Sequence, residues 1–449
     1  MLPSRRETAT WLALAVGGGL ELRYDFLRVL TTNYKEKFQL DSDALIWSTL
    51  ADPSRGALDP MVRGTGEDYL SQVGLHGMVM ALVSPGASLY QPLRMVTAML
   101  LAAVLATAVV ASWRAWGGRA ATVLGALLFT SPWLNAFGAS AYWQLWTFLL
   151  PMLVPLLVWP RLGTGRRKWI KGGLLISGLV FLKCLCGYEF ITTLVLGVAA
   201  VVAFHEFRER FDRRLLVRLV AAMTAAVAGF AAAMAVHALQ LYVRFGNLSG
   251  LEGAAGDRTF WPTKLEVIAP RVEAKAGPVG RWLLDQNEVV GVWLFRMRYF
   301  LQDPAVALPA PRAFGLGPLP FEIPIYLFII VWAVLARRAF RGRGADAALQ
   351  RRLAVAAGIS LAGALSWLVL AYGHMIVHFH IDAIVFYLPF LPLVFAMIAV
   401  RVATAGRALR RPADAELRTS PQPDPDDLED AYAMNQPQAV GRVPVGAPS

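Results

Sequence analysis

Residues 93–113 read LRMVTAMLLAAVLATAVVASW, and this stretch decides the fold class. It has the length of one membrane crossing, because a helix needs about 20 predominantly apolar residues to span a bilayer core. Similar blocks recur along a chain that is 56% hydrophobic and only 16% charged. The repetition predicts an all-α protein, a polytopic membrane helix bundle.

We expect about ten transmembrane helices. Their ranges are 9–29, 93–113, 119–138, 142–160, 169–186, 188–206, 215–243, 320–337, 353–372 and 382–402. The first has a basic start and no small-residue cleavage site, which predicts an uncleaved anchor, although Glu21, Arg23 and Asp25 interrupt it. Residues 1–402 are thus expected to form one transmembrane domain. The Pro-, Asp- and Gln-rich residues 403–449 are expected to form a disordered cytoplasmic tail.

The formal net charge of +12 reports topology and not a nucleic-acid partner. Lys and Arg fill every second connection between the predicted spans, whereas the connections 138–142, 187–189 and 372–381 contain none. This positive-inside pattern places both termini in the cytoplasm and two long loops, 31–92 and 244–318, on the extracytoplasmic face with short interfacial helices. The richness in Ala, Arg and Gly suggests a bacterial chain in the inner (plasma) membrane.

Ionisable side chains at membrane depth cost about 2.5–3.5 kcal/mol each, so each needs a partner or a role. In the predicted topology they collect at the outer ends of the spans. The short outer turns contribute Tyr142, Gln144, Lys183, Tyr188, Glu189, His374, His378, His380 and Asp382, and the loops add Asp41, Asp43, Glu67, Asp68, Gln72, His76 and Arg258. This convergence predicts one site on the extracytoplasmic face.

The stretch HMIVHFHID, residues 374–382, is open to three interpretations. A helix would place His374, His378 and Asp382 on one face, and an extended chain would add His380. His378, His380 and Asp382 could ligate a divalent metal. Alternatively, a histidine oriented by Asp382 recognises a phosphate, or the polar residues simply cap helix ends.

Asp41 and Asp43 form the sequence D-S-D in the first outer loop, where Asp43 would also suit a helix N-cap. A short acidic motif in the first extracytoplasmic loop, ahead of a bundle of apolar spans, resembles the integral-membrane glycosyltransferases of the C superfamily (GT-C fold). The resemblance implies a polyprenyl-phosphate-linked sugar as donor and an envelope glycan, lipid or protein as acceptor. It also implies Asp41 or Asp43 as the general base.

Sugar transfer from a lipid phosphate also needs groups that stabilise the departing phosphate. We expect Lys183 and His378, with a basic residue of the second loop such as Arg258, to bind it. Glu189 and Gln144 would contact the sugar or the acceptor. No cofactor is assigned, and a divalent metal stays open. The alternatives are a transporter or flippase for a lipid or small solute, and a non-catalytic subunit of an envelope-assembly complex.

Overall fold

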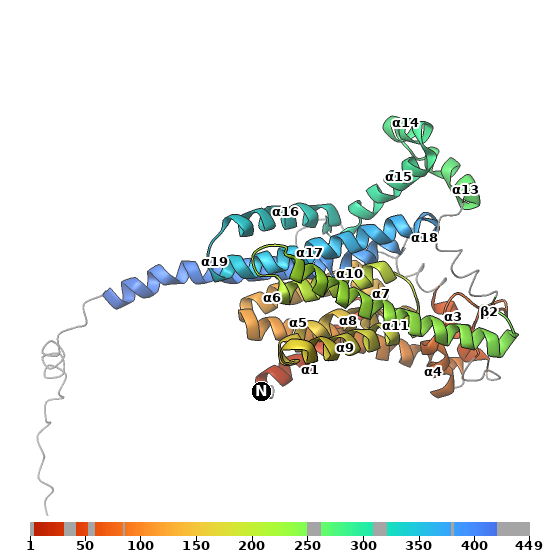
Figure 1. Cartoon of the computed structure of the whole chain (residues 1–449), viewed down its shortest axis with the longest axis horizontal. Coiled ribbons are helices and arrows are strands. Elements are labelled where there is room, and N and C mark those ends of the chain that lie inside the picture. Colours follow the sequence, from red (N-terminus) through yellow and green to blue (C-terminus); the bar gives the residue numbers. More distant parts are fainter. Residues whose placement is uncertain are drawn as a thin grey trace, which may run out of the picture. The chain divides into compact units, whose positions relative to one another are not determined.

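The computed structural model describes residues 4–30, 42–52, 59–83, 86–248, 262–308, 321–378 and 381–419. These ranges are mostly helical, with two small antiparallel sheets (Figure 1). The chain divides into a first unit, Met1–Ala403, and a second unit, Thr404–Ser449. The prediction of an all-α bundle is confirmed in its main feature.

Long helices, together with two shorter ones, make up most of the first unit. They are α1 (Arg5–Tyr24), α5 (Tyr90–Trp116), α6 (Gly118–Phe129), α7 (Pro132–Gly138), α8 (Leu145–Val158), α9 (Gly165–Cys186), α10 (Ile191–Glu206), α11 (Arg213–Phe245), α16 (Ile325–Arg341), α17 (Ala345–Leu370) and α19 (Phe390–Thr419). α6 and α7 are the two shorter ones, and α19 passes the predicted domain boundary at residue 402 and continues beyond the end of the first unit at Ala403. The remainder of the predicted tail, residues 420–449, lies outside the described residues.

Short elements occupy the connections. They are α3 (Asp43–Ala51), α4 (Leu75–Val83), α13 (Pro262–Glu273), α14 (Pro278–Gln286), α15 (Glu288–Gln302) and α18 (Tyr372–Val377), the 3-10 helices η1 (Ala87–Leu89), η2 (Trp159–Arg161) and η4 (Asp382–Tyr387), and the strands β1 (Met61–Val62), β2 (Asp68–Tyr69), β3 (Pro304–Leu308) and β4 (Phe321–Pro324). β1 pairs with β2 and β3 with β4, with Met61 opposite Tyr69 and Leu308 opposite Phe321. The two long predicted loops therefore do carry short helices.

In the part of the chain that the structure describes, four helices are long and apolar enough to cross a membrane, namely α5, α9, α11 and α17. A fifth crossing results if α6 and α7, which meet at a bend of 64°, count as one broken span. The apolar helices α8, α10 and the apolar part of α19 are shorter. The chain is thus a helical membrane protein by the length and composition of its helices, but the ten predicted crossings are not confirmed.

Glycines bring neighbouring helices into close contact, as is common in membrane bundles. A Cβ at Gly229 of α11 would overlap the backbone oxygen of Ser177 in α9. A Cβ at Gly363 of α17 would lie 3.3 Å from the backbone oxygen of Thr193 in α10. The Thr193 hydroxyl also donates to the Gly363 carbonyl at 3.1 Å. Side-chain size therefore limits how closely these helices pack.

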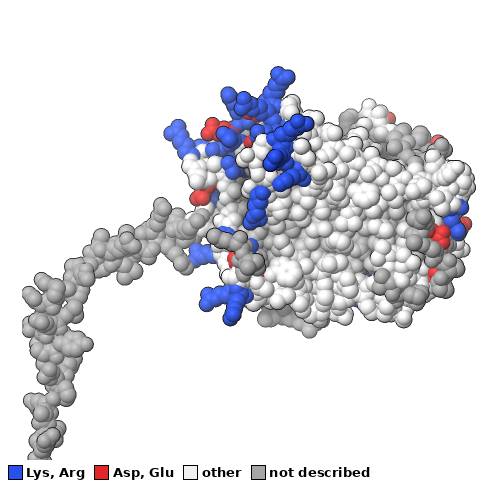
Figure 2. All heavy atoms as spheres, turned by 60° about the horizontal axis from the view of Figure 1, so that its bottom comes forward, with Lys and Arg blue, Asp and Glu red and all other residues white. Residues whose placement is uncertain are grey.

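Lys and Arg gather at one end of the first unit, which we call the basic end, and a broad band without charges follows it (Figure 2). The basic end contains the connections α5–α6, α8–α9, α10–α11 and α16–α17. There the Glu206 carboxylate pairs with Lys168 at 2.7 Å and with Arg218 at 2.5 Å. The connections α7–α8, α9–α10 and α17–α19 lie at the opposite end.

Ionisable side chains that are buried in the described part of the chain share one location. They are Glu21, Asp25, Asp43, His76, Arg94, Lys183, Glu189, His237, Arg296, His374 and Asp382. Each belongs to the half of a long helix that points away from the basic end, or to a short element or turn at the opposite end. The predicted one-sided distribution of these groups is therefore present in the fold.

Candidate functional site

The Asp43 carboxylate ties the first turn of α3 to the turn before α8. It is 1% exposed, and its Oδ1 accepts from the Ser140 hydroxyl at 2.5 Å and from the Tyr142 N–H at 3.1 Å. Its Oδ2 accepts from the Tyr90 hydroxyl at 2.8 Å and lies 3.3 Å from the Arg94 guanidinium. An acceptor hydroxyl would have to displace one of these donors to reach Asp43. Asp43 therefore acts as a buried structural residue that holds α3 to the turn before α8, and we call this arrangement the buried tether.

A second set of contacts starts at Tyr142 and ends at Glu189. When the Gln72 amide is oriented by its hydrogen-bond network, its oxygen accepts from the Tyr142 hydroxyl at 3.0 Å. Its nitrogen then lies 2.9 and 3.0 Å from the two carboxylate oxygens of Glu189. The Tyr69 hydroxyl lies 3.2 Å from that of Tyr142. Gly187 leaves room for Gln72 and Glu189, because a Cβ there would lie 2.5 Å from the amide end of the Gln72 side chain.

Lys183 stabilises the turn between α9 and α10. Its ammonium group is fully buried and donates to the backbone carbonyl of Gly187 and, at 2.9 Å, to that of Glu189. It also lies 3.9 Å from the centre of the Phe148 ring. This ammonium satisfies carbonyls at the C-terminal end of α9, so its contacts within the fold are those of a helix cap. Its predicted contact with a donor phosphate stays a prediction.

His76 of α4 is buried beside this turn. Neither ring nitrogen has a hydrogen-bond partner in the part of the chain that the structure describes. Burial lowers the pKa of His76 to about 4, with a further lowering by the positive charge of Lys183 and an opposing effect of Glu189. The imidazole is therefore neutral at pH 7. Its ring packs edge-on against Tyr142, with the ring centres 5.7 Å apart.

His374 and Asp382 form a buried pair between α18 and α19. Nδ1 of His374 lies 3.1 and 3.3 Å from the two oxygens of Asp382, and the Trp367 indole N–H donates to Asp382 at 3.4 Å. Asp382 is fully buried, and His374 is 8% exposed. Nε2 of His374 has no hydrogen-bond partner among the described side chains. The exposed His378 ring lies 4.6 Å from the His374 ring.

The pairing determines how His374 can act. When Nδ1–H donates to the carboxylate, Nε2 presents its lone pair and becomes the nitrogen that accepts a proton. Of the helical and extended forms considered for residues 374–382, the helical form extends only to the C-cap His378, because α18 ends at Val377. Asp382, the first residue of η4, lies against His374.

Phe190 lies between Trp143, in the turn before α8, and the His374–Asp382 pair. Its ring stacks on Trp143 with the centres 5.9 Å apart, and it meets the His374 ring edge-on at 6.2 Å. Phe190 and Gln144 both precede a helix and both adopt left-handed backbone angles, with φ of 62° and 47°. Left-handed backbone at residues other than glycine costs about 1–3 kcal/mol and is concentrated at functional sites. The N-termini of α8 and α10 follow directly after them.

Two further predicted residues have structural contacts at this end. The Gln144 amide donates to Ala141 O at 2.6 Å and accepts from the Trp146 indole at 2.6 Å. Tyr188 packs against Phe230 and the His237 ring, with centres 5.8 and 5.5 Å apart. Asp41, Arg258 and His380 lie outside the described residues.

The metal interpretation gains no complete ligand set from the geometry. Within the described ranges, no group of three or more His, Cys, Asp or Glu side chains could hold a metal ion. Of the three residues named for it, Asp382 is engaged by His374 and Trp367, His378 is exposed, and His380 is not described.

Sequence reasoning missed the partners that hold these groups. Arg94 is 4% exposed and donates to the Ala139 carbonyl at 2.7 Å while facing Asp43. Its position in the first turn of a predicted span was a usable signal, because a charge there requires a partner. Trp367 and Tyr90 gave no such signal, since aromatic residues at span ends are ordinarily interface anchors.

Comparison with protein-family models, curated proteins and solved structures gave no match for this chain.

Proposed function

We propose that this chain is a membrane glycosyltransferase that moves a sugar from a polyprenyl-phosphate carrier to an envelope acceptor. Under the positive-inside rule the basic end faces the cytoplasm, so the opposite end and its buried clusters face the extracytoplasmic side. The observation that carries the proposal is the His374–Asp382 pair, a histidine oriented by a buried carboxylate.

In the proposed reaction the bond between the sugar and the carrier phosphate breaks while the acceptor oxygen attacks the sugar. The acceptor proton moves to Nε2 of His374, and Asp382 stabilises the resulting imidazolium. We assign the base to this pair, and not to Asp43, because the Asp43 oxygens are held by four hydrogen-bond donors. Asp41 stays a candidate from the sequence.

The departing phosphate needs positive or hydrogen-bonding groups. At the N-termini of α8 and α10 the N-cap residue makes no side-chain hydrogen bond to the helix, so backbone N–H groups and the positive end of the helix dipole lie at the same turns. His378, exposed beside His374, is the side chain we assign to this phosphate. Glu189, with Gln72 and Tyr142, is assigned to hydroxyl groups of the sugar or acceptor.

The experiment uses the purified full-length protein in lipid nanodiscs with a panel of polyprenyl-phosphate sugars and membrane-derived acceptors. His374→Gln is expected to lower kcat/KM by about 10²–10⁴, the usual contribution of a general base. Asp382→Asn should lower kcat more than it changes KM and should shift the pH profile. His205→Gln, at the basic end, is the matched control. Full transfer by His374→Gln would remove the assigned base.

A transporter or flippase is the second candidate, because the same polar groups could line a path. A path needs polar groups toward both faces, yet the buried ionisable residues in the described ranges all lie toward one end. Uptake or lipid scrambling by proteoliposomes, without transfer from any donor, would favour this alternative.

A further inference from the structure

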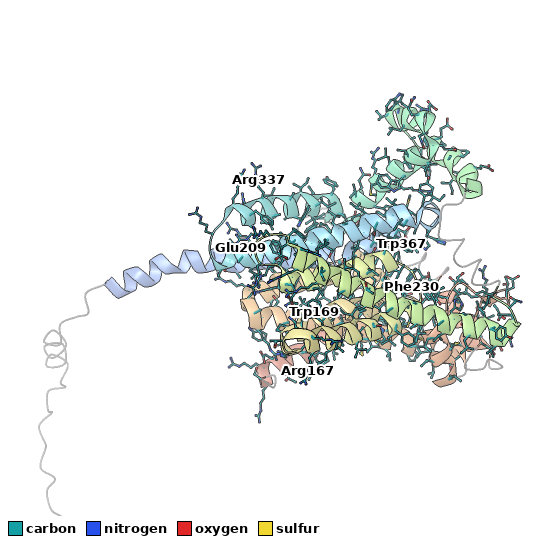
Figure 3. All side chains as sticks on the ribbon, viewed as in Figure 1. Arg167, Trp169, Glu209, Phe230, Arg337 and Trp367 are labelled. Carbon is teal, nitrogen blue, oxygen red and sulfur yellow. The ribbon has the colours of Figure 1, made fainter. Side chains whose placement is uncertain are left out.

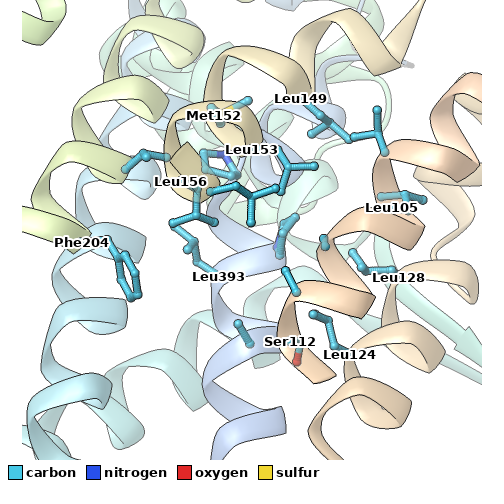
Figure 4. A pocket seen from close by; sticks show the side chains of 18 of the residues that line it. Leu105, Ser112, Leu124, Leu128, Leu149, Met152, Leu153, Leu156, Phe204 and Leu393 are labelled. Carbon is cyan, nitrogen blue, oxygen red and sulfur yellow. The ribbon is translucent and has the colours of Figure 1, made fainter. Parts of the chain in front are cut away.

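An apolar groove of about 300 Å³ lies in the basic half of the first unit, between α5, α6, α8, α10, α17 and α19. Leucine, methionine and phenylalanine side chains converge on it (Figure 4). Its lining at the basic end comes from Ser112, Ala115 and Trp116 of α5. Given about 30 Å³ per water molecule, the groove has room for about ten water-sized groups. Because water finds almost no polar partner in it, hydrocarbon is the fitting content.

Ser112 is the exception in this lining. Its hydroxyl is buried, the residue is 3% exposed, and the oxygen has no hydrogen-bond partner among the described residues. A buried hydroxyl without a partner is destabilising, so a ligand that supplies an acceptor here would be favoured. An ester carbonyl is such an acceptor, whereas a plain hydrocarbon chain is not.

A second pocket, of about 540 Å³, continues the groove at the basic end. Both pockets are lined by Ala111, Ala115 and Leu157, so they adjoin each other at these residues. The second contains the guanidinium groups of Arg114 and Arg161. Figure 3 shows the ribbon and side chains around this end, including the labelled Arg167 and Trp169 of α9.

Both guanidinium groups keep donors for a ligand. Arg114 donates through Nε at 2.7 Å and one terminal nitrogen at 3.0 Å to Glu7, and Arg161 donates once, to the Leu157 carbonyl at 3.0 Å. An arginine has five N–H donors, and its fork geometry suits phosphate. The pocket therefore combines phosphate-binding groups with a charge that favours an anion.

We propose that the groove and its basic pocket bind one anionic glycerophospholipid of the adjoining leaflet. Its phosphate contacts Arg114 and Arg161, an ester carbonyl accepts from Ser112, and one acyl chain fills the apolar groove. This site lies toward the basic end, away from the His374–Asp382 pair, so it is independent of the proposed reaction. A polyprenyl phosphate lacks the ester that would accept from Ser112, and a zwitterionic phospholipid lacks the net negative charge that the two arginines favour.

The test is native mass spectrometry of the full chain after delipidation and titration with phosphatidylglycerol, phosphatidylcholine or undecaprenyl phosphate. We expect one phosphatidylglycerol to bind at least fivefold more tightly than either other lipid. Arg161→Gln, Ser112→Ala and the groove-filling Ala108→Phe should each weaken binding threefold or more. Arg167→Gln, an exposed arginine of α9 outside both pockets, should not.

Several outcomes would overturn the proposal. They are equal loss of binding in Arg167→Gln, preferential retention of undecaprenyl phosphate, and binding that none of the three variants weakens. Ser112→Ala removes an unpartnered hydroxyl, so this variant should fold as well as the parent chain. If Ala108→Phe does not fold, Ser112→Ala and Arg161→Gln still decide the result.

Discussion

Replacing Asp43 by Asn distinguishes a buried tether from a catalytic base. The substitution removes the negative charge that faces Arg94 at 3.3 Å, where both side chains are almost fully buried, at 1% and 5% exposure. It also leaves the four hydrogen-bond donors to Asp43 with a weaker acceptor. Breaking a buried ion pair from one side costs about 3–5 kcal/mol, because the remaining charge stays buried without its partner.

The expected result is a loss of stability that can be measured without any substrate. In detergent, the thermal midpoint of Asp43→Asn should fall by about 5 °C or more, given roughly 2–4 °C per kcal/mol for a large domain. Asp285→Asn, at an exposed position of α14, is the matched control and should leave the midpoint unchanged. Size-exclusion chromatography with fluorescence detection after heating provides the assay.

The double variant tests the ion pair itself. Replacing Arg94 by Met in the Asp43→Asn background removes the uncompensated charge, so it should restore part of the lost stability. If Asp43→Asn unfolds at the temperature of the parent chain, the tether reasoning is wrong. Lost sugar transfer at unchanged stability would return Asp43 to the role of base.

Three further predictions concern the turns and the helix contacts. Lys183→Met should lower the thermal midpoint, because two backbone carbonyls of its own turn lose their hydrogen-bond donor. If Lys183 only bound the phosphate of the sugar donor, the substitution would change the KM for that sugar donor and leave the midpoint unchanged. The pKa of His76 is lowered from 6.5 to about 4 in the folded chain, so on acidification the unfolded chain takes up a proton at this imidazole first. The free energy of unfolding should therefore fall by up to about 3 kcal/mol as the pH drops from 6.5 to 4. His76→Phe should flatten this dependence in thermal melts at a series of pH values. Gly229→Ala should destabilise by about 1–3 kcal/mol since its Cβ meets the backbone of Ser177, whereas Gly178→Ala enters open space and should be neutral or stabilising in the same melts.

Hydropathy predicted the long helices better than their ends. The predicted range 93–113 lies within α5, and 169–186 lies within α9. The last predicted span began at residue 382, but α19 begins at Phe390 because residues 382–387 form a 3-10 helix. After Asp382 the run AIVFYLPF contains no charged residue, and hydropathy measures only that apolar character. Backbone form in this run depends on proline and on the pairing of Asp382, which hydropathy does not measure.

The location of the candidate site was predictable, and its contacts were not. Because a charge in hydrocarbon is costly, the polar side chains were predicted to lie at the ends of the helices, and Glu189 and His374 were predicted to lie at the same end of the bundle. The partners come from distant sequence: Ser140 is 97 positions from Asp43, and the Arg94 guanidinium faces it from another helix. Lys183 is expected from the sequence to bind a phosphate, and in the fold its ammonium group donates to a backbone carbonyl of its own turn. That carbonyl lies within reach without a ligand, and hydropathy does not indicate such a contact.

The one-sided burial of ionisable groups limits which functions the chain can perform. An ionised group costs about 2.5–3.5 kcal/mol at the centre of a span and less near the ends, where these groups lie, so a purely structural bundle would still gain by replacing several of them with apolar residues. Asp43 with Arg94 and His374 with Asp382 offset part of this cost by pairing, but pairs of this kind are often no more stable than apolar substitutes. The neutral His76 avoids the cost of a charge, but both of its ring nitrogens lack a hydrogen-bond partner among the described residues. Structural need alone therefore does not account for the cluster. The sugar transfer that we propose at one membrane face would account for both its composition and its confinement to one end, whereas a transport path would be expected to extend such groups toward the basic end.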